Sequence, residues 1–205
     1  PMKKGESIIF SGGITEVSPR TLKNLWEKEL TRRSPRTNMF SCLKNSAEQF
    51  YKREGDKTYL LAGYPWFGAR ARDEFIALTS CTILIDRMDY FDAIIKTAIP
   101  EIERFLNGER DNFKLEGIDE PDVFLWFIRA IQQFSEYKSI EEAANRFGDI
   151  VSKVIQFIRK QNHPTLFMHN NGLVYVNGTE KPATWMNSVW SGSRGSPASS
   201  TRVFI

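Results

Sequence analysis

The sequence predicts an all-α fold built of helical hairpins, with minor short strands. Apolar residues recur at helical spacing in about six segments, and most of these segments begin at a capping or proline signal. Patterns that favour strands are confined to Lys57 to Ala62 and Gly172 to Val176, which fit either short strands or straight connections. Because the links between successive helices are short, we expect αα-hairpins stacked side by side.

The first two helices are expected in the N-terminal quarter of the chain. Ser18 followed by Pro19 places a capping serine before a proline at the first helical position, and this helix should end near Arg33. A second helix follows from about Asn38 with an apolar face. We expect Gly55 to end it, because glycine adopts the left-handed conformation of a helix end at little cost.

Three helices are expected in the middle of the chain. One runs on from Arg72. The next opens at Asp89, with Pro100 as a kink and Gly108 as the stop. Pro121 then starts the fifth helix, since its fixed φ suits the first turn.

The last helix has the clearest start signal. Ser139 and Glu142 form a capping box, in which each side chain can satisfy a free backbone N–H of the first turn. Apolar residues then repeat along one face of the helix: Ala143, Phe147, Ile150, Val151, Val154 and Ile158.

Composition argues against several classes of function. The 205 residues are 41% hydrophobic and 26% charged, as expected of one soluble globular unit. The net charge of +3 is too small to indicate a nucleic-acid partner, and no apolar stretch approaches the ~20 residues that span a bilayer. No signal-peptide core follows the first residues, so we expect no membrane partner and a cytoplasmic location.

Metal and cofactor chemistry are not expected. His163 and His169 are six residues apart in a predicted loop, with no carboxylate cluster beside them, so we interpret both as surface histidines. No other motif calls for a cofactor, and the expected cofactor set is therefore empty.

The most informative run extends from Leu61 to Leu78, where aromatic rings, arginines and a carboxylate stand between a turn and a helix. Trp66 offers a flat ring that can stack on a pyranose face. Arg72 beside Asp73 supplies donors and acceptors for sugar hydroxyls in one patch. The alternative is a packing role for the ring and a structural salt bridge for the charges. Residue types alone leave both interpretations open.

Four segments of the chain resemble motifs of one family, in the order in which that family carries them. The sequence AGYPWFGARARDEFIAL at residues 62–78 is similar to the AGYPWFGDWGRDTFIAL signature of the amylo-α-1,6-glucosidase part of glycogen debranching enzymes. The segment SAEQF at 46–50 resembles the stretch before that signature, DVFLWFI at 122–128 resembles its DASLWFI motif, and TWMN at 184–187 resembles its TWMD motif. The resemblance covers roughly residues 10 to 190.

This resemblance implies a fold and a domain division. The family forms an (α/α)6 toroid, in which six hairpins make two concentric rings of helices around a sugar-binding pocket, and this chain holds about half of one. We expect residues 1–14 to be the end of a preceding β domain or a linker, 15–190 to be the partial toroid, and 191–205 to be a linker-like tail that is truncated or frame-shifted. Helix faces left uncovered in a half toroid would favour self-association.

The resemblance also implies the activity and its partner. A glycogen-debranching type α-1,6-glucosidase cleaves branch points of an α-glucan, such as glycogen or limit dextrin, by inverting hydrolysis with two carboxyl groups. In the family's pattern Arg72 and Asp73 grip hydroxyls of the terminal glucose. Trp66 and Trp185 are the expected stacking rings, ahead of Trp126, which sits among apolar neighbours in the sequence.

The catalytic pair is where this sequence departs from the family. Asn187 stands at the position of the family's proton-donating Asp, and an amide has no carboxyl proton to release. Asp122 is the alternative acid, although we prefer it as a sugar ligand, and helix capping explains it equally well. No position corresponds to the family's base, which lies far downstream, so we expect this chain alone to be inactive.

Two other functions stay open at this point. Asn187, together with Ala69-Arg70-Ala71 where the family reads Asp-Trp-Gly, favours a catalytically altered member that binds α-glucan without cleaving it. A helical interaction scaffold with no sugar ligand is the third class, and it requires the aromatic and Arg-Asp positions to be buried.

Overall fold

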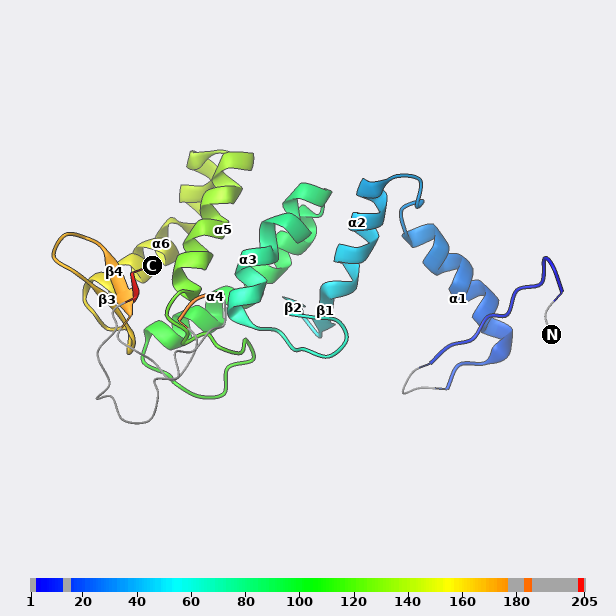
Figure 1. Ribbon diagram of the computed structural model, residues 1–205, viewed down its shortest axis with the longest axis horizontal. Coiled ribbons are helices and arrows are strands. Elements are labelled where there is room, and N and C mark those ends of the chain that lie inside the picture. Colours follow the sequence, from blue (N-terminus) through cyan, green and yellow to red (C-terminus); the bar gives the residue numbers. More distant parts are fainter. Residues whose placement is uncertain (1–2, 13–15, 177–182, 186–202, 205) are drawn as a thin grey trace. The chain divides into compact units, whose positions relative to one another are not determined.

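The chain is mainly helical, as predicted. The computed structural model describes residues 3–12, 16–176, 183–185 and 203–204, and these contain six α-helices and short antiparallel strands (Figure 1). The chain divides into two units, Pro1–Glu48 and Gln49–Ile205. Within the described part, no helix combines the length and the apolar character needed to cross a membrane.

The N-terminal unit contains two helices joined by a short connection. Helix α1 covers Pro19–Arg32 and α2 covers Met39–Ala47, which confirms the two predicted helix starts and the first predicted end. The side chain of Asn45 is buried and holds α2 to the connection that precedes it. Its Oδ1 accepts from the N–H of Ser34 at 3.0 Å, and its Nδ2 donates to the carbonyl of Ser34 at 2.8 Å. Asn38 caps α2 by accepting a bond from a backbone N–H of its first turn.

The prediction that the second helix runs to Gly55 is wrong. Helix α2 stops at Ala47, and a 3-10 turn over Glu48–Phe50 leads into a hairpin of β1 (Tyr51–Glu54) and β2 (Lys57–Leu60). Gly55 does adopt a left-handed φ of 62°, but it does so in the hairpin turn. The apolar spacing continues to Phe50, one turn beyond the end of α2, and strand pairing takes over the backbone hydrogen bonds from Tyr51 onward.

Four helices make up most of the C-terminal unit, and three of them begin within one residue of the predicted start, whereas α5 begins at Val123, two residues after Pro121. Pro100 lies inside its helix without ending it, and Gly108, with φ of 99°, follows the end of that helix. Ser139 Oγ accepts a bond from the N–H of Glu142 at 3.0 Å, as the capping box predicts. The helices are α3 (Ala71–Cys81), α4 (Met88–Leu106), α5 (Val123–Tyr137) and α6 (Ile140–Arg159), and a 3-10 turn (Ile83–Ile85) separates α3 from α4.

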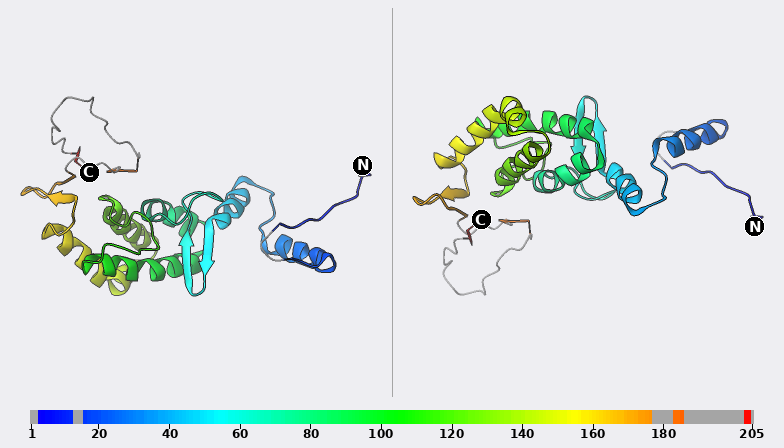
Figure 2. Two further views of the ribbon diagram at one scale, coloured as in Figure 1. Left: turned by 90° about the horizontal axis from the view of Figure 1, so that it is seen from below. Right: turned by 90° about the horizontal axis from the view of Figure 1, so that it is seen from above.

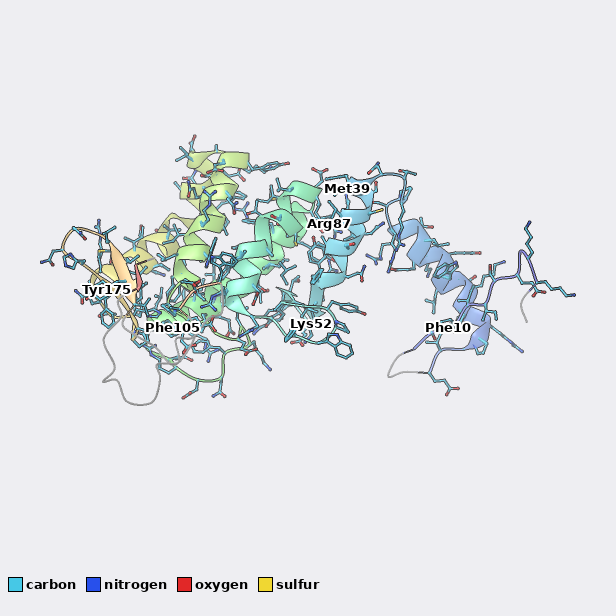
Figure 3. The ribbon with its side chains drawn as sticks, in the orientation of Figure 1. Phe10, Met39, Lys52, Arg87, Phe105 and Tyr175 are labelled. Atoms are coloured by element: carbon cyan, nitrogen blue, oxygen red, sulfur yellow. The ribbon has the colours of Figure 1, made fainter. Side chains whose placement is uncertain are left out.

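Alternate helices of this unit are neighbours in space. Helix α3 packs against α5 and α4 packs against α6, while α5 and α6 also pack as a hairpin (Figure 2). The hairpin of β1 and β2 lies beside α4 and α3. Phenylalanines fill much of the shared core: Phe75, Phe91, Phe105, Phe124, Phe127 and Phe134. Phe105, labelled in Figure 3, contacts the rings of Phe124 and Phe157 at centroid distances of 5.4 and 5.9 Å.

A small antiparallel sheet follows α6. Strand β3 (Leu166–Met168) pairs with β4 (Val174–Val176), which pairs in turn with β5 (Val203–Phe204). The stretch from Gly172 to Val176 therefore contains a strand, and Gly172 lies in the turn before it with a φ of 89°.

Candidate functional site

A short loop before α3 exposes three aromatic rings. We call residues 62–68 the aromatic loop. It is closed at its base by an antiparallel bridge between Leu61 and Ala69 and by a bond from the N–H of Ala62 to the carbonyl of Gly68 at 3.0 Å. The side chains at its tip are open to solvent, with exposed fractions of 58% for Tyr64, 85% for Trp66 and 58% for Phe67. Exposed rings on a closed loop can stack on a sugar.

The far end of this loop is joined to a segment 45 residues further along the chain. We call residues 116–122 the acidic segment. The N–H of Ala71 donates to the carbonyl of Glu116 at 2.8 Å, and the N–H of Glu116 donates to the carbonyl of Ala69 at 3.0 Å. These two bonds form a parallel bridge centred on Arg70 and Glu116. The start of α3 is therefore fixed to the acidic segment by backbone bonds.

Arg72 strengthens the same connection through its side chain. Its Nε donates to both carboxylate oxygens of Asp122, at 2.8 and 3.0 Å, and Nη2 lies 2.8 Å from Oδ1. On the other side, Nη1 lies 2.7 Å from Oε2 of Glu120. Arg72 is 4% exposed and Asp122 is 1% exposed, so both are closed to a sugar in this arrangement. Sequence reasoning expected each of them to contact the glucan directly.

Asp122 also holds an indole ring. Although it occupies the N-cap position of α5, its side chain makes no capping bond. Instead, Oδ2 accepts a hydrogen bond from Nε1 of Trp126 at 3.0 Å, one turn along the helix. Trp126 is half-buried and packs against the core, as its apolar neighbours in the sequence indicated. Both oxygens of Asp122 are thus occupied by donors.

Glu120 is a partner of Arg72 that the sequence analysis missed. It is almost buried, and burial raises the pKa of its carboxyl against the lowering effect of Arg72. Gly117 has a φ of 71°, and a Cβ there would lie 2.9 Å from Cδ of Glu120, so glycine leaves room for this side chain to fold back. The only sequence signal was the acidic run around Pro121, and no local pattern connects that run to Arg72.

Asp73 differs from its neighbour in the Arg-Asp pair. It lies in the first turn of α3 and is half-buried. Its carboxylate has no hydrogen-bond or ion-pair partner among the residues that the structure describes. The positive end of the α3 dipole stabilises a negative charge at this position. Asp73 is therefore the member of the pair whose oxygens are available to a ligand.

The two remaining candidates come from the C-terminal part of the chain. Trp185 is 61% exposed, and it makes no ring contact or hydrogen bond with Arg72, Asp122 or Trp66 within the described ranges. Asn187 lies outside the described residues. The structure thus brings Arg72 and Asp122 together, with Trp66 in the aromatic loop and Asp73 in the first turn of α3, while Trp185 makes no contact with Arg72, Asp122 or Trp66 within the described residues.

The prediction that His163 is a surface residue is wrong, whereas His169 is exposed as expected. The imidazole of His163 is enclosed by the rings of Phe105, Phe124 and Phe157. Its Nδ1 accepts a bond from the N–H of Leu166 at 3.0 Å, and burial lowers the pKa of His163 to about 4. No group of three or more His, Cys, Asp or Glu side chains in the described part of the chain is arranged to hold a metal ion.

Comparison with known proteins assigns the chain to a family. No curated protein and no solved structure matched the chain. One family model matched, described as amylo-alpha-1,6-glucosidase, and the match extends over residues 44–205. It includes the aromatic loop, the Arg72 network and the α5 start, and it covers most of the chain. On this evidence the chain belongs to the amylo-alpha-1,6-glucosidase family.

Proposed function

We propose that this chain forms the glucan-binding side of a glycogen-debranching type α-1,6-glucosidase, which acts in the cytoplasm on branch points of glycogen or limit dextrin by inverting hydrolysis. The observation that carries the proposal is the aromatic loop, whose exposed Trp66 stands on a loop closed by backbone bonds, and which leads into the helix that carries Asp73 in its first turn. A flat ring and a carboxylate are the two groups that bind a pyranose face and its hydroxyls.

The helix arrangement supports the toroid part of this proposal. A toroid of hairpins requires every second helix to be a spatial neighbour, since one ring takes the first helix of each hairpin and the other ring takes the second. The pairs α3 with α5 and α4 with α6 meet this requirement. We propose that residues 15–190 form part of such a toroid, with the aromatic loop at the end of the helices where α3 and α5 begin.

A second candidate is an α-glucan-binding member of the family that does not cleave its ligand. Asn187 stands where the resemblance places the proton donor. Asp122, the alternative acid, is buried, and its oxygens accept bonds from Arg72 and Trp126. It therefore lacks the open carboxyl that a general acid presents to a glycosidic oxygen. These observations favour binding over cleavage for the residues on this chain.

Glucan binding by the 205-residue chain tests the proposal. We would titrate maltoheptaose and a branched limit dextrin by calorimetry, with the β-linked cellohexaose as a ligand control. We expect the α-glucans to bind and Trp66→Ala to abolish the heat of binding. Tyr137→Ala is the matched control, because it removes another exposed ring at the opposite end of α5, about 20 Å away along the helix axis.

The complete gene product, with and without Asn187→Asp, separates the two candidates, because no position of this chain corresponds to the family's base. Release of glucose from limit dextrin by the unaltered protein would show cleavage, and release only by Asn187→Asp would identify a binding protein that lost its proton donor. Failure of the unaltered chain to bind either α-glucan would sink the proposal and favour the scaffold interpretation.

A further inference from the structure

The guanidinium of Arg72 contacts two carboxylates of the acidic segment. The carboxylate of Asp122 contacts Nε and Nη2, and the carboxylate of Glu120 contacts Nη1. Each of these carboxylates has little or no exposure to solvent. All three nitrogens of the guanidinium thereby face protein oxygens, in the bidentate geometry that gives arginine its specificity.

This network joins two elements that carry the exposed groups of the site. On one side is α3, whose first turn holds Asp73 and whose start continues from the aromatic loop. On the other side is the acidic segment, which leads into α5. The backbone bridge between Arg70 and Glu116 fixes the same two elements only a few residues away. Side-chain and backbone bonds therefore join the start of α3 to the acidic segment at two nearby positions.

The position of the Trp126 ring depends on the same network of bonds. Its indole nitrogen donates to the Asp122 oxygen that also accepts from Nε of Arg72. A change at Arg72 would therefore reach Trp126 through Asp122, without any ligand being present. That relation gives a spectroscopic signature of the network that is independent of sugar binding.

Arg72 and Asp73 are adjacent on a helix, so their side chains diverge by about 100° around its axis. The structure has Arg72 turned to the two buried carboxylates and Asp73 without a partner among the described residues. Arg72 is therefore enclosed by protein carboxylates, whereas the carboxylate of Asp73 is open to a ligand. The two residues cannot both be sugar ligands in this arrangement.

From this geometry we infer that Arg72 is a positioning residue, which fixes the aromatic loop and Asp73 for the glucan through Glu120 and Asp122 and makes no contact with the sugar. The inference rests on the proposed glucan-binding function. It assigns Glu120 to the same positioning network and leaves Asp73 and Trp66 as the groups that touch the ligand.

The test uses the full 205-residue chain and its affinity for maltoheptaose. Arg72→Lys keeps the charge and loses the fork, and we expect affinity to fall about tenfold because the loop base loosens. The indole N–H resonance of Trp126, assigned with Trp126→Phe, should shift in the ligand-free protein. Saturating maltoheptaose should leave the Arg72 Nε–H resonance of the unaltered chain in place.

Two further variants keep the test decisive. Arg146→Lys is the matched control, since Arg146 also contacts two carboxylates, Asp92 and Glu142, and neither belongs to the aromatic loop or to the acidic segment. It should bind like the unaltered chain. If Arg72→Lys does not fold, Glu120→Gln is used in its place. This variant removes the ion pair between Arg72 and Glu120 and keeps the pair between Arg72 and Asp122, and we expect it to weaken maltoheptaose binding several-fold.

The outcomes distinguish this inference from the proposed function. Absence of α-glucan binding by the unaltered chain overturns both. Tight binding that survives Arg72→Lys and Glu120→Gln overturns the inference alone, as does a shift of the Arg72 Nε–H resonance when maltoheptaose saturates the chain.

Discussion

Oε2 of Glu74 accepts a hydrogen bond from the backbone N–H of Leu60 at 2.9 Å, while Oε1 of the same carboxyl has no partner within the described part of the chain. The side chain is 1% exposed where α3 meets β2. Burial raises the pKa of Glu74 to about 8 from its usual 4.5. The folded protein therefore holds this carboxyl protonated near neutral pH.

The pH dependence of unfolding should reveal that proton. The unfolded chain releases it near pH 4.5 and the folded chain near pH 8, so stability from this group is full below pH 4.5 and declines as the pH rises to 8. Glu74→Gln should remove the decline and raise the free energy of unfolding at pH 8 by about 2 to 5 kcal/mol relative to the unaltered chain. Urea unfolding at pH 5 and pH 8 measures this, and equal pH profiles for the two proteins would contradict it. Exposed Glu136→Gln is the control.

His163 should lower the free energy of unfolding as the pH falls, in a pH range below that of Glu74. Its pKa is lowered from 6.5 to about 4, so its contribution is full above pH 6.5 and is lost as the pH falls through 4. The total loss corresponds to about 3 kcal/mol. His163→Asn keeps an acceptor near Nδ1 for the N–H of Leu166 but does not titrate. Its unfolding free energy should be lower at pH 7 and flatter from pH 7 to 4. A slope as steep as that of the unaltered chain would exclude the imidazole as its source.

Gly117 should resist substitution while another glycine accepts it. Gly117→Ala forces a φ of 71° on alanine and brings its Cβ against Glu120, so we expect a loss of about 1 to 2 kcal/mol. Gly148→Ala is the matched control in α6, where a Cβ meets nothing within 4 Å and alanine should stabilise by about 0.5 to 1 kcal/mol. Thermal unfolding of both variants gives the comparison, and equal shifts would show that the Glu120 contact does not constrain the segment.

Asp73→Ala should weaken α-glucan binding by about 1 to 3 kcal/mol, because a charged acceptor for a sugar hydroxyl is lost. Calorimetric titration with maltoheptaose measures the loss. Glu141→Ala removes an exposed acid from the first turn of α6 and should leave affinity unchanged. Unaltered affinity in Asp73→Ala would return Asp73 to a structural role at the helix start.

Local signals predicted the helices because each depends on residues a few positions apart. Ser139 caps the start of α6, and the bond from the N–H of Glu142 to Ser139 Oγ confirms this half of the capping box, while the Glu142 carboxylate pairs with Arg146 instead. Gly55 shows the limit of such signals. Its left-handed conformation was predicted correctly, but a hairpin turn and a helix end require the same φ, and only pairing of Tyr51 with Leu60 distinguishes them.

The site was predictable in part for the same reason. The aromatic loop is contiguous in the sequence, so residue types and the resemblance could single out Trp66 and Asp73 as candidates, and their role in binding stays a prediction. The pairing of Arg72 with Asp122 spans 50 residues and Glu120 has no motif of its own, so neither the burial of the pair nor its third member could be deduced. The enclosure of His163 escaped prediction because its three phenylalanine neighbours come from three different helices.

The closure of the aromatic loop by backbone bonds has a thermodynamic consequence for any ligand. The bonds at Leu61, Ala62 and Ala69 order the loop when the protein folds, so a ligand that meets the tip does not have to order it again. None of these bonds depends on the side chains at the tip. Rings at Tyr64, Trp66 and Phe67 can therefore be exchanged to change what is recognised while the closure of the loop stays the same.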